Sequence, residues 1–200
     1  NFTIAEVEGW GPLVTTGLMT TISLIAGWWV LHQWNREVTL YENGFTYREG
    51  SKTVFFTYAE IRSFRLRAER LRYFGGLLRR TVYRFTLLTV KDERIVLTGL
   101  YSRIAELGDK LEALIVAAQR PIATERLTRN ERLNFSDTLT LSQQGLHEGG
   151  RDLAWSALGG WKVERGTLIL LEGQAEWFRI PLAQVDNLAL LIGLLKERRG

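Results

Sequence analysis

Histidine is the side chain best suited to general base catalysis near neutral pH, and the chain contains only His32 and His147. His147 precedes Glu148 in a predicted strand, so these two side chains point to opposite faces of the sheet. No serine lies in the Gly-x-Ser-x-Gly motif that positions the nucleophile of many hydrolases. We therefore interpret His147 as a surface strand residue and predict that the chain is not an enzyme.

The chain also has few residues of the types that bind a metal or a cofactor. The chain has no cysteine, and two histidines are too few for a histidine-rich metal cluster. The glycine pairs at 75–76 and 149–150 lack the Lys-Ser/Thr that follows in a phosphate-binding loop. The carboxylates cluster at predicted turns and in the connector 119–137, where charged residues are common in any fold. We predict no catalytic residue, no metal, no cofactor and no small-molecule substrate.

Arginine is concentrated between residues 62 and 84, where Glu69 is the only acid. The net charge of +4 and the pI near 9.6 favour anionic partners. The stretch could bind anionic lipid or an acidic protein partner. The alternative is a solvated hairpin face without a partner, and nucleic acid is disfavoured as a ligand. Residues 71–78 are apolar for a predicted loop, which suggests a contact patch. The expected partner or lipid contacts are Arg62, Arg65, Arg67, Arg70, Arg72, Tyr73, Phe74, Leu77, Leu78, Arg79 and Arg80.

The N-terminal region, residues 1–35, is predicted to contain a single transmembrane helix. Pro12–Trp34 is long enough to cross the hydrocarbon core and carries no charged side chain. Its threonines and serines can bond to backbone carbonyls one turn back. The segment lacks the basic start and the small-residue cleavage site of a signal peptide. It also lacks the charged residue expected in a buried soluble helix of this length and the Lys/Arg face of an interfacial helix. Residues expected at the helix or its interfaces are Trp10, Gly17, Thr21, Trp28, Trp29 and Trp34, with Gly17 and Thr21 at small-xxx-small spacing.

The flanking charges predict an orientation. Acids precede the helix, whereas Arg36, Arg48 and Lys52 follow it. By the positive-inside rule the N-terminus lies outside and residues 36–200 lie in the cytoplasm, with the chain in the inner membrane.

After Arg36 the hydrophobic period changes from helical to alternating. Alternating runs separated by turn signals, such as Asn43-Gly44, predict antiparallel strands, which are followed by helices over 102–118 and 182–198. The first helix is expected to stop before Pro121. The second half repeats this order: Leu40–Gly44 matches Leu141–Gly145, and Tyr58–Ile61 matches Trp155–Leu158. We predict domains at 36–120 and 138–200, joined by a connector at 121–137.

Seven or so antiparallel strands followed by one helix is the order of a pleckstrin-homology-like fold. A membrane helix precedes Val38–Tyr47 and is followed further along the chain by Tyr58–Ile61, Leu133–Asp137 and Gly145-Leu146. In these features the chain resembles a family of uncharacterised bacterial membrane proteins with tandem PH-like domains. The chain departs from that pattern at Tyr58, where tryptophan is expected, and at Ser136, where glycine is expected. The resemblance implies a mainly β (α+β) fold with two tandem PH-like domains, each with a C-terminal helix. It carries over no catalytic or lipid-binding residue.

These features predict a non-catalytic, membrane-anchored accessory or scaffold subunit of a larger membrane complex, respiratory and photosynthetic assemblies being candidates. Its partners would be other subunits of that complex and anionic membrane lipid. The alternative is an anionic-lipid-binding sensor or adaptor, in which the arginines would hold headgroups.

Overall fold

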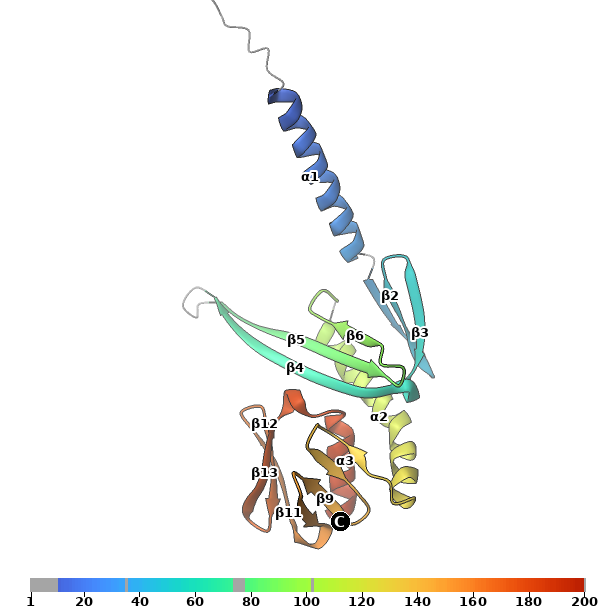
Figure 1. Cartoon of the computed structure of the whole chain (residues 1–200), viewed down its shortest axis with the longest axis vertical. Helices are drawn as coiled ribbons and strands as arrows, with labels where there is room; N and C mark the ends of the chain where they lie inside the picture. Colours follow the sequence, from blue (N-terminus) through green and yellow to red (C-terminus); the bar gives the residue numbers. More distant parts are fainter. Residues whose placement is uncertain (1–10, 35, 74–77, 102, 200) are drawn as a thin grey trace, which may run out of the picture. The chain divides into compact units, whose positions relative to one another are not determined.

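The computed structural model describes residues 11–34, 36–73, 78–101 and 103–199, and the side chains of 13–31, 36–68, 81–101 and 103–198 (Figure 1). The chain is mainly β with one N-terminal apolar helix and several small antiparallel sheets. It divides into two compact units. One comprises residues 1–39 and 46–54, and the other comprises 40–45 and 55–200.

Helix α1, Gly11–Trp34, is continuous over 24 residues. The Oγ1 atoms of Thr20 and Thr21 donate to the carbonyls of Thr16 and Gly17, both at 2.8 Å. The predicted return of these hydroxyls to the backbone is thereby confirmed, and it satisfies two polar groups inside an apolar segment. The part Leu13–Leu31 is long and apolar enough to cross a membrane. Its large apolar side chains are exposed from Leu13 to Leu31, an arrangement that a bilayer or a partner helix would stabilise.

The first half of the β region consists of two three-stranded sheets and a helix. The sheets have the orders β1-β2-β3 and β4-β5-β6, and a single 3₁₀ turn, η1, connects them. The bounds are β1 Arg36–Leu40, β2 Gly44–Glu49, β3 Lys52–Thr57, η1 Tyr58–Glu60, β4 Ile61–Tyr73, β5 Leu78–Thr89, β6 Arg94–Leu97 and α2 Ile104–Thr128.

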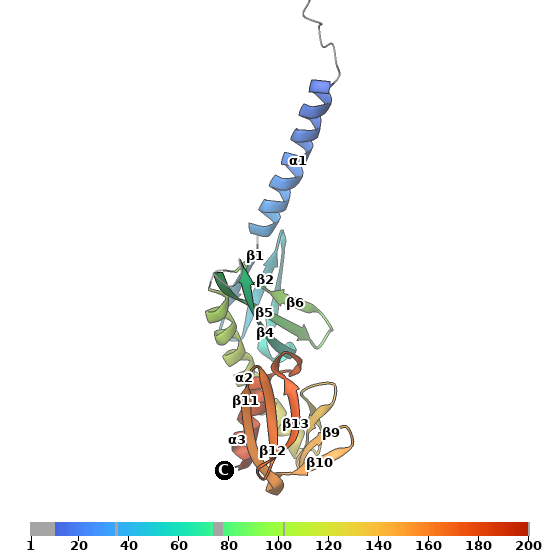
Figure 2. The same ribbon diagram turned by 90° about the vertical axis from the view of Figure 1, so that its left-hand side faces the viewer.

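The second half has the same order with one additional short strand. Its sheets have the orders β10-β9-β8-β7 and β11-β12-β13 and are connected by the 3₁₀ turn η3 (Figure 2). The bounds are β7 Leu133–Asn134, β8 Leu139–Leu141, β9 Gly145–Glu148, β10 Arg151–Ala154, η3 Trp155–Ala157, β11 Leu158–Glu164, β12 Thr167–Glu172, β13 Ala175–Pro181, η4 Leu182–Gln184 and α3 Leu188–Arg199.

The two halves agree in local geometry at their first hairpins. The amide of Tyr41 donates to the carbonyl of Gly44, and the amide of Ser142 donates to that of Gly145, both at 2.8 Å. A Cβ atom on Gly44, the first residue of β2, would lie 2.3 Å from a backbone carbonyl oxygen of the next strand, β3. A Cβ atom on Gly145, the first residue of β9, would lie 2.1 Å from one of β10. Only glycine permits this close approach of two backbones, which explains why both turns end in it.

The geometry also agrees at the connections that follow. Tyr58 in η1 and Trp155 in η3 each donate from the ring to a backbone carbonyl of the hairpin turn, at 2.7 and 2.9 Å respectively. Each C-terminal helix is preceded by a left-handed residue, Arg103 (φ 52°) in the first half and Asn187 (φ 49°) in the second. Each carbonyl of these two residues accepts the amide four residues on at 3.0 Å, so the helices begin in the same way.

Each half buries its own apolar side chains. In the first half the completely buried residues include Phe45, Ile61, Leu87 and Leu97 from the strands and Leu111 from α2. In the second half one cluster joins both sheets, α3 and the end of α2. Because α2 contributes to both cores, it links the two halves through packing as well as through the chain.

Two helix predictions are wrong. Helix α2 continues through Pro121 to Thr128, although proline removes a backbone N–H and costs about 3 kcal/mol inside a helix. The burial of Ala123 and Leu127 in the core of the second half offsets this cost. The last helix begins at Leu188 instead of Leu182, because the chain forms η4 and then turns at Asn187. The predicted domain bounds 36–120, 121–137 and 138–200 stay predictions.

Candidate functional site

The two β halves meet where strand β4 contacts the turn before α3. The register of β4 against β5 shifts between Ile61 and Ser63, which leaves the carbonyl of Arg62 available. Asn187 uses both ends of its side-chain amide here: Nδ2 donates to Arg62 O, and Oδ1 accepts the amide of Phe64, both at 2.9 Å. The backbone amide of Asn187 also donates to Phe64 O at 2.9 Å. Asn187 therefore binds β4 much as a neighbouring strand would.

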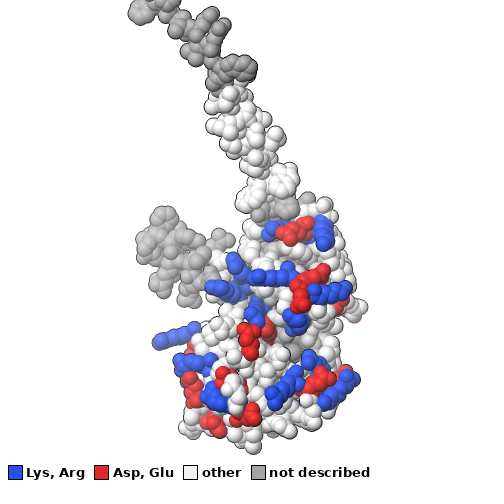
Figure 3. Space-filling model, in the orientation of Figure 1, with Lys and Arg blue, Asp and Glu red and all other residues white. Residues whose placement is uncertain are grey.

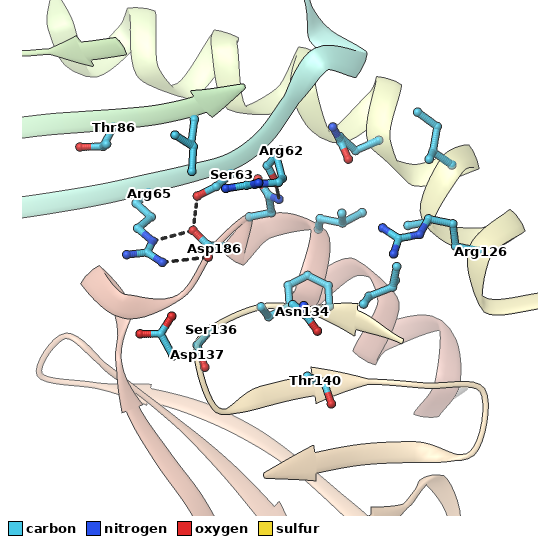
Figure 4. A pocket seen from close by; sticks show the side chains of 18 of the residues that line it. Arg62, Ser63, Arg65, Thr86, Arg126, Asn134, Ser136, Asp137, Thr140 and Asp186 are labelled. Carbon is cyan, nitrogen blue, oxygen red and sulfur yellow. Dashed lines mark hydrogen bonds and ion pairs between the residues drawn. The ribbon is translucent and has the colours of Figure 1, made fainter. Parts of the chain in front are cut away.

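Asp186 adds a charged contact to the same strand (Figure 4). Its Oδ1 accepts Arg65 Nε at 2.5 Å and its Oδ2 accepts Arg65 Nη2 at 3.0 Å, a two-point geometry that suits arginine and carboxylate. The Ser63 hydroxyl also donates to Oδ1. The hydrogen bond to Asp186 is the main cause that raises the pKa of Arg65. The side chains of Ser63 and Arg65 on β4 are thus both bonded to Asp186 of the second half.

Helix α2 supplies two further connections. Gln119 Nε2 donates to the carbonyl of Ile61 at 2.5 Å, next to the bulge of β4. Glu112 accepts the backbone amide of Ala189 in the first turn of α3, one of the amides that a helix cannot satisfy internally. Burial raises the pKa of Glu112, and the bond from Ala189 opposes that rise. Strand β4, helix α2 and the start of α3 therefore form one hydrogen-bonded junction.

A cavity of about 860 Å³ opens beside this junction. Buried apolar side chains of Ala123, Leu133, Phe135 and Leu190 form part of its wall. Polar side chains from both halves surround them, and Figure 4 shows Arg126 reaching in from α2 opposite strands β7 and β8. The charged residues that line the cavity are Arg62, Arg65, Arg94, Arg126, Asp137 and Asp186.

His147 is not the surface residue that the sequence predicts. Its side chain is 13% exposed, its Nε2 lies 2.7 Å from Ser142 Oγ, and its Nδ1 lies 2.6 Å from Asp152 Oδ1. This is the connectivity of a serine–histidine–aspartate triad. However, Ser142 is buried, and its Oγ also accepts the amide of Gln144 at 3.2 Å inside the hairpin turn. We interpret the set as a link between β8, β9 and β10, because a nucleophile needs open access to substrate.

The described arginines of the predicted contact stretch lie on β4 and are engaged within the chain. Arg62 pairs with Asp92 at 2.8 Å, Arg65 pairs with Asp186, and Arg67 lies opposite Arg84 in the β4–β5 register. Arg67 also has an interaction within the chain. Figure 3 shows positive and negative side chains interspersed over the face in view, without a large area of one sign.

The rest of the stretch extends the same hairpin, so the predicted loop at 71–78 is wrong at 71–73 and 78, and residues 74–77 lie outside the described part. Backbone pairing continues to Tyr73 and Leu78, because alternating branched and aromatic residues favour strands over a long loop. The side chains of Arg70, Arg72, Tyr73, Leu78, Arg79 and Arg80 lie outside the described part, as do Phe74 and Leu77.

The residues predicted at the membrane helix are distributed along α1. Gly17 and Thr21 lie one turn apart, Thr21 bonds back to Gly17, and no atom lies within 4 Å of a Cβ placed on Gly17. Trp28 and Trp29 are exposed near the C-terminal end of α1. Trp34 is the last residue of α1, with its side chain outside the described part, and Trp10 also lies outside it.

Sequence reasoning missed the residues that build the junction: Ser63, Gln119, Asp186 and Asn187, and it also missed Ser142 and Asp152 around His147. A signal for the first group is present in the sequence. Asp186-Asn187 directly precedes the apolar run of α3, and aspartate and asparagine are preferred where helices begin. No local pattern indicates that these two residues bond to a strand more than 120 positions earlier.

These features define a mainly β, α+β chain with one apolar N-terminal helix and two similar β halves locked at one junction. The chain belongs to a family of unknown function, DUF6585, whose profile matches residues 3–199. Comparisons with curated proteins and with solved structures give no match.

Proposed function

We propose that the chain is a non-catalytic accessory or scaffold subunit of a larger membrane protein complex. In this proposal α1 packs among other membrane helices, with the N-terminus outside, and the β region braces cytoplasmic surfaces of the inner membrane complex of a bacterium. The two β halves would be PH-like domains, since each places two small antiparallel sheets before a C-terminal helix.

The observation that carries the proposal is the junction between the halves. Asn187 and Asp186 bind β4 through side-chain and backbone groups, and Gln119 adds a bond from α2. The backbone amide of buried Phe64 donates to the side chain of Asn187, so this hydrogen bond is protected from competition by water. A stiff two-part body is suited to holding other subunits at a fixed spacing, whereas a sensor with independent modules would not need it.

The ion pairs count against the alternative of a lipid sensor at the described arginines. Arg65 is held by two contacts to Asp186, so its transfer to a lipid phosphate would leave a partly buried carboxylate without its partner. Arg62 is paired at the surface and is less committed. Selective, saturable binding of the chain to one anionic headgroup, kept at physiological salt, would favour the sensor.

The test is gentle detergent extraction from the native membrane, followed by size separation and mass spectrometry of the co-migrating chains. The scaffold proposal expects the 22.9 kDa chain in a large particle with a constant set of companions. A variant with the junction broken, Asn187→Gly, should reach the membrane and release those companions more readily. An exposed control, Arg179→Gln, should leave the particle intact. Migration of the wild-type chain alone would refute the proposal.

A further inference from the structure

The cavity beside the junction contains polar side chains that the fold does not use. Arg94 on β6, Asn134 on β7 and Thr140 on β8 line it, and none of the three side chains makes a hydrogen bond or ion pair with any described residue. The Thr86 hydroxyl on β5 is uncommitted within the same described part of the chain. Free donors and acceptors from several elements that converge on one cavity are typical of a ligand site.

The charges that line the cavity favour an anion. Four arginines face two aspartates, and one of those aspartates, Asp186, is already neutralised by Arg65. Arg62 and Arg126 have ion-pair partners outside the cavity, Asp92 and Glu131, each at 2.8 Å. Both pairs are exposed, with side chains between 43% and 73% accessible.

Exposed pairs of this kind are held weakly, so an incoming anion can take over the guanidinium. Arg94 and Arg126 are therefore the cations that a ligand can use at least cost, whereas Arg65 stays part of the junction.

The apolar wall of the cavity favours a ligand that carries an apolar group as well as a charge. Ile122 of α2 lines the cavity with 38% of its surface exposed, beside the buried side chains of Ala123, Leu133, Phe135 and Leu190. A bare inorganic anion would leave this apolar surface in contact with water, whereas an attached hydrocarbon or aromatic group would cover it. The volume of about 860 Å³ lies in the range of small-molecule sites.

We propose that this cavity binds an organic anion, with a phosphate or carboxylate group held by Arg94 and Arg126 and an apolar body against Ile122. Asn134 and Thr140 supply hydrogen bonds that orient the ligand. The site is independent of the scaffold function, since it uses groups that neither the junction nor α1 employs. It goes beyond the expectation from the sequence that the chain has no small-molecule substrate, since it assigns a bound ligand and no reaction.

The probe for this site is 4-fluorophenyl phosphate, which joins a phosphate to an apolar ring and is observed directly by fluorine NMR. The full chain in phosphatidylcholine nanodiscs should broaden and shift its signal in a saturable way. A neutral analogue, 4-fluorobenzyl alcohol, should bind much more weakly. Arg94→Gln and Arg126→Gln should each weaken binding about tenfold through loss of a charge-assisted hydrogen bond. Arg179→Gln, which changes an exposed arginine outside the cavity, should bind as the wild type does.

Competition separates two sources of the anion. Displacement of the probe by glycerol 3-phosphate supports a free organic phosphate, whereas displacement only by dihexanoyl phosphatidic acid supports a lipid headgroup. The proposal is overturned if the wild type binds no probe, if the neutral analogue binds equally well, or if neither arginine variant lowers the affinity while its thermal unfolding matches the wild type.

Discussion

Replacement of Asn187 tests the junction at its most buried hydrogen bonds. Asn187→Gly removes the bond from Nδ2 to Arg62 O and the bond from Phe64 N to Oδ1, both 2.9 Å long. The backbone at φ 49° suits glycine without strain, so this variant isolates the side-chain bonds. Asn187→Ala removes the same bonds and keeps a Cβ in the left-handed region without the polar side chain that lets asparagine adopt it.

The expected magnitudes follow from these contacts. Each hydrogen bond contributes about 1 kcal/mol net, and an unsatisfied amide at buried Phe64 adds roughly 1–3 kcal/mol. Asn187→Gly should therefore lower the unfolding free energy by about 3–5 kcal/mol. Asn187→Ala should lower it by about 1 kcal/mol more, because alanine is disfavoured at a positive φ. The fold itself should persist, since the amide of Asn187 still donates to Phe64 O.

The internal repeat provides the matched control. Arg103 occupies the equivalent position before α2, with φ 52° and no side-chain hydrogen bond that caps the helix. Arg103→Gly relieves the left-handed strain and loses only an exposed ion pair to Glu106 at 3.8 Å, so it should stabilise the chain by up to about 1 kcal/mol. Substitution by glycine should thus lower the unfolding free energy at position 187 and raise it at position 103.

Native-state hydrogen exchange on the full chain in nanodiscs measures the effect, by the protection of amides in 61–68 and 185–192. Protection in both segments should fall in Asn187→Gly and should not fall in Arg103→Gly. An unchanged exchange rate for Phe64 in Asn187→Gly would show that the side-chain amide does not hold the halves together. Equal effects of the glycine and alanine variants would refute the assignment of left-handed strain.

Three further substitutions probe the helices. Burial raises the pKa of Glu112 above its ordinary value of 4.5, so the folded state binds this proton more tightly and stability falls as pH rises from 4.5 through the raised pKa. Glu112→Gln should abolish that fall, which urea unfolding at several pH values checks; a parallel pH profile would contradict it. Gly108→Ala should destabilise by about 1–3 kcal/mol despite better helix propensity, because its Cβ would lie 2.0 Å from the buried Phe85 ring. Gly193→Ala in α3 meets only the flexible end of Arg120, at 2.6 Å, and should be neutral or stabilising. Urea unfolding measures both glycine variants, and equal losses of stability at the two positions would argue against the Phe85 contact.

Most strands can be predicted because their signals are local. The alternation of apolar and polar residues and turn signals such as Asn43-Gly44 correctly predict antiparallel strands. The match between Tyr58–Glu60 and Trp155–Ala157 also holds, since both form a 3₁₀ turn directly after the last strand of the first sheet of their half. A stretch without charge between Gly9 and Trp34 similarly predicts α1 by length and composition alone.

The failed predictions lie where distant packing outweighs a local preference. Pro121 is a helix breaker by its own chemistry, yet α2 continues because Ala123 and Leu127 reach the core of the second half. The final helix begins late because Asn187 is held in a left-handed turn by β4. In both cases the competing energy comes from residues that the local sequence window does not contain.

The sequence by itself determined the apolar helix, the alternating strands and the repetition of their order, because each depends on periodicity within a few residues. Only the tertiary structure decided which polar residues matter. It brought Asp186 and Asn187 to a bulge in β4, placed Ser142 and Asp152 on either side of His147, and left Arg94 at a cavity without a partner among the described residues. The physical reason is that hydrogen bonds and ion pairs act over about 3 Å, so they depend on how distant strands pack and not on spacing along the chain.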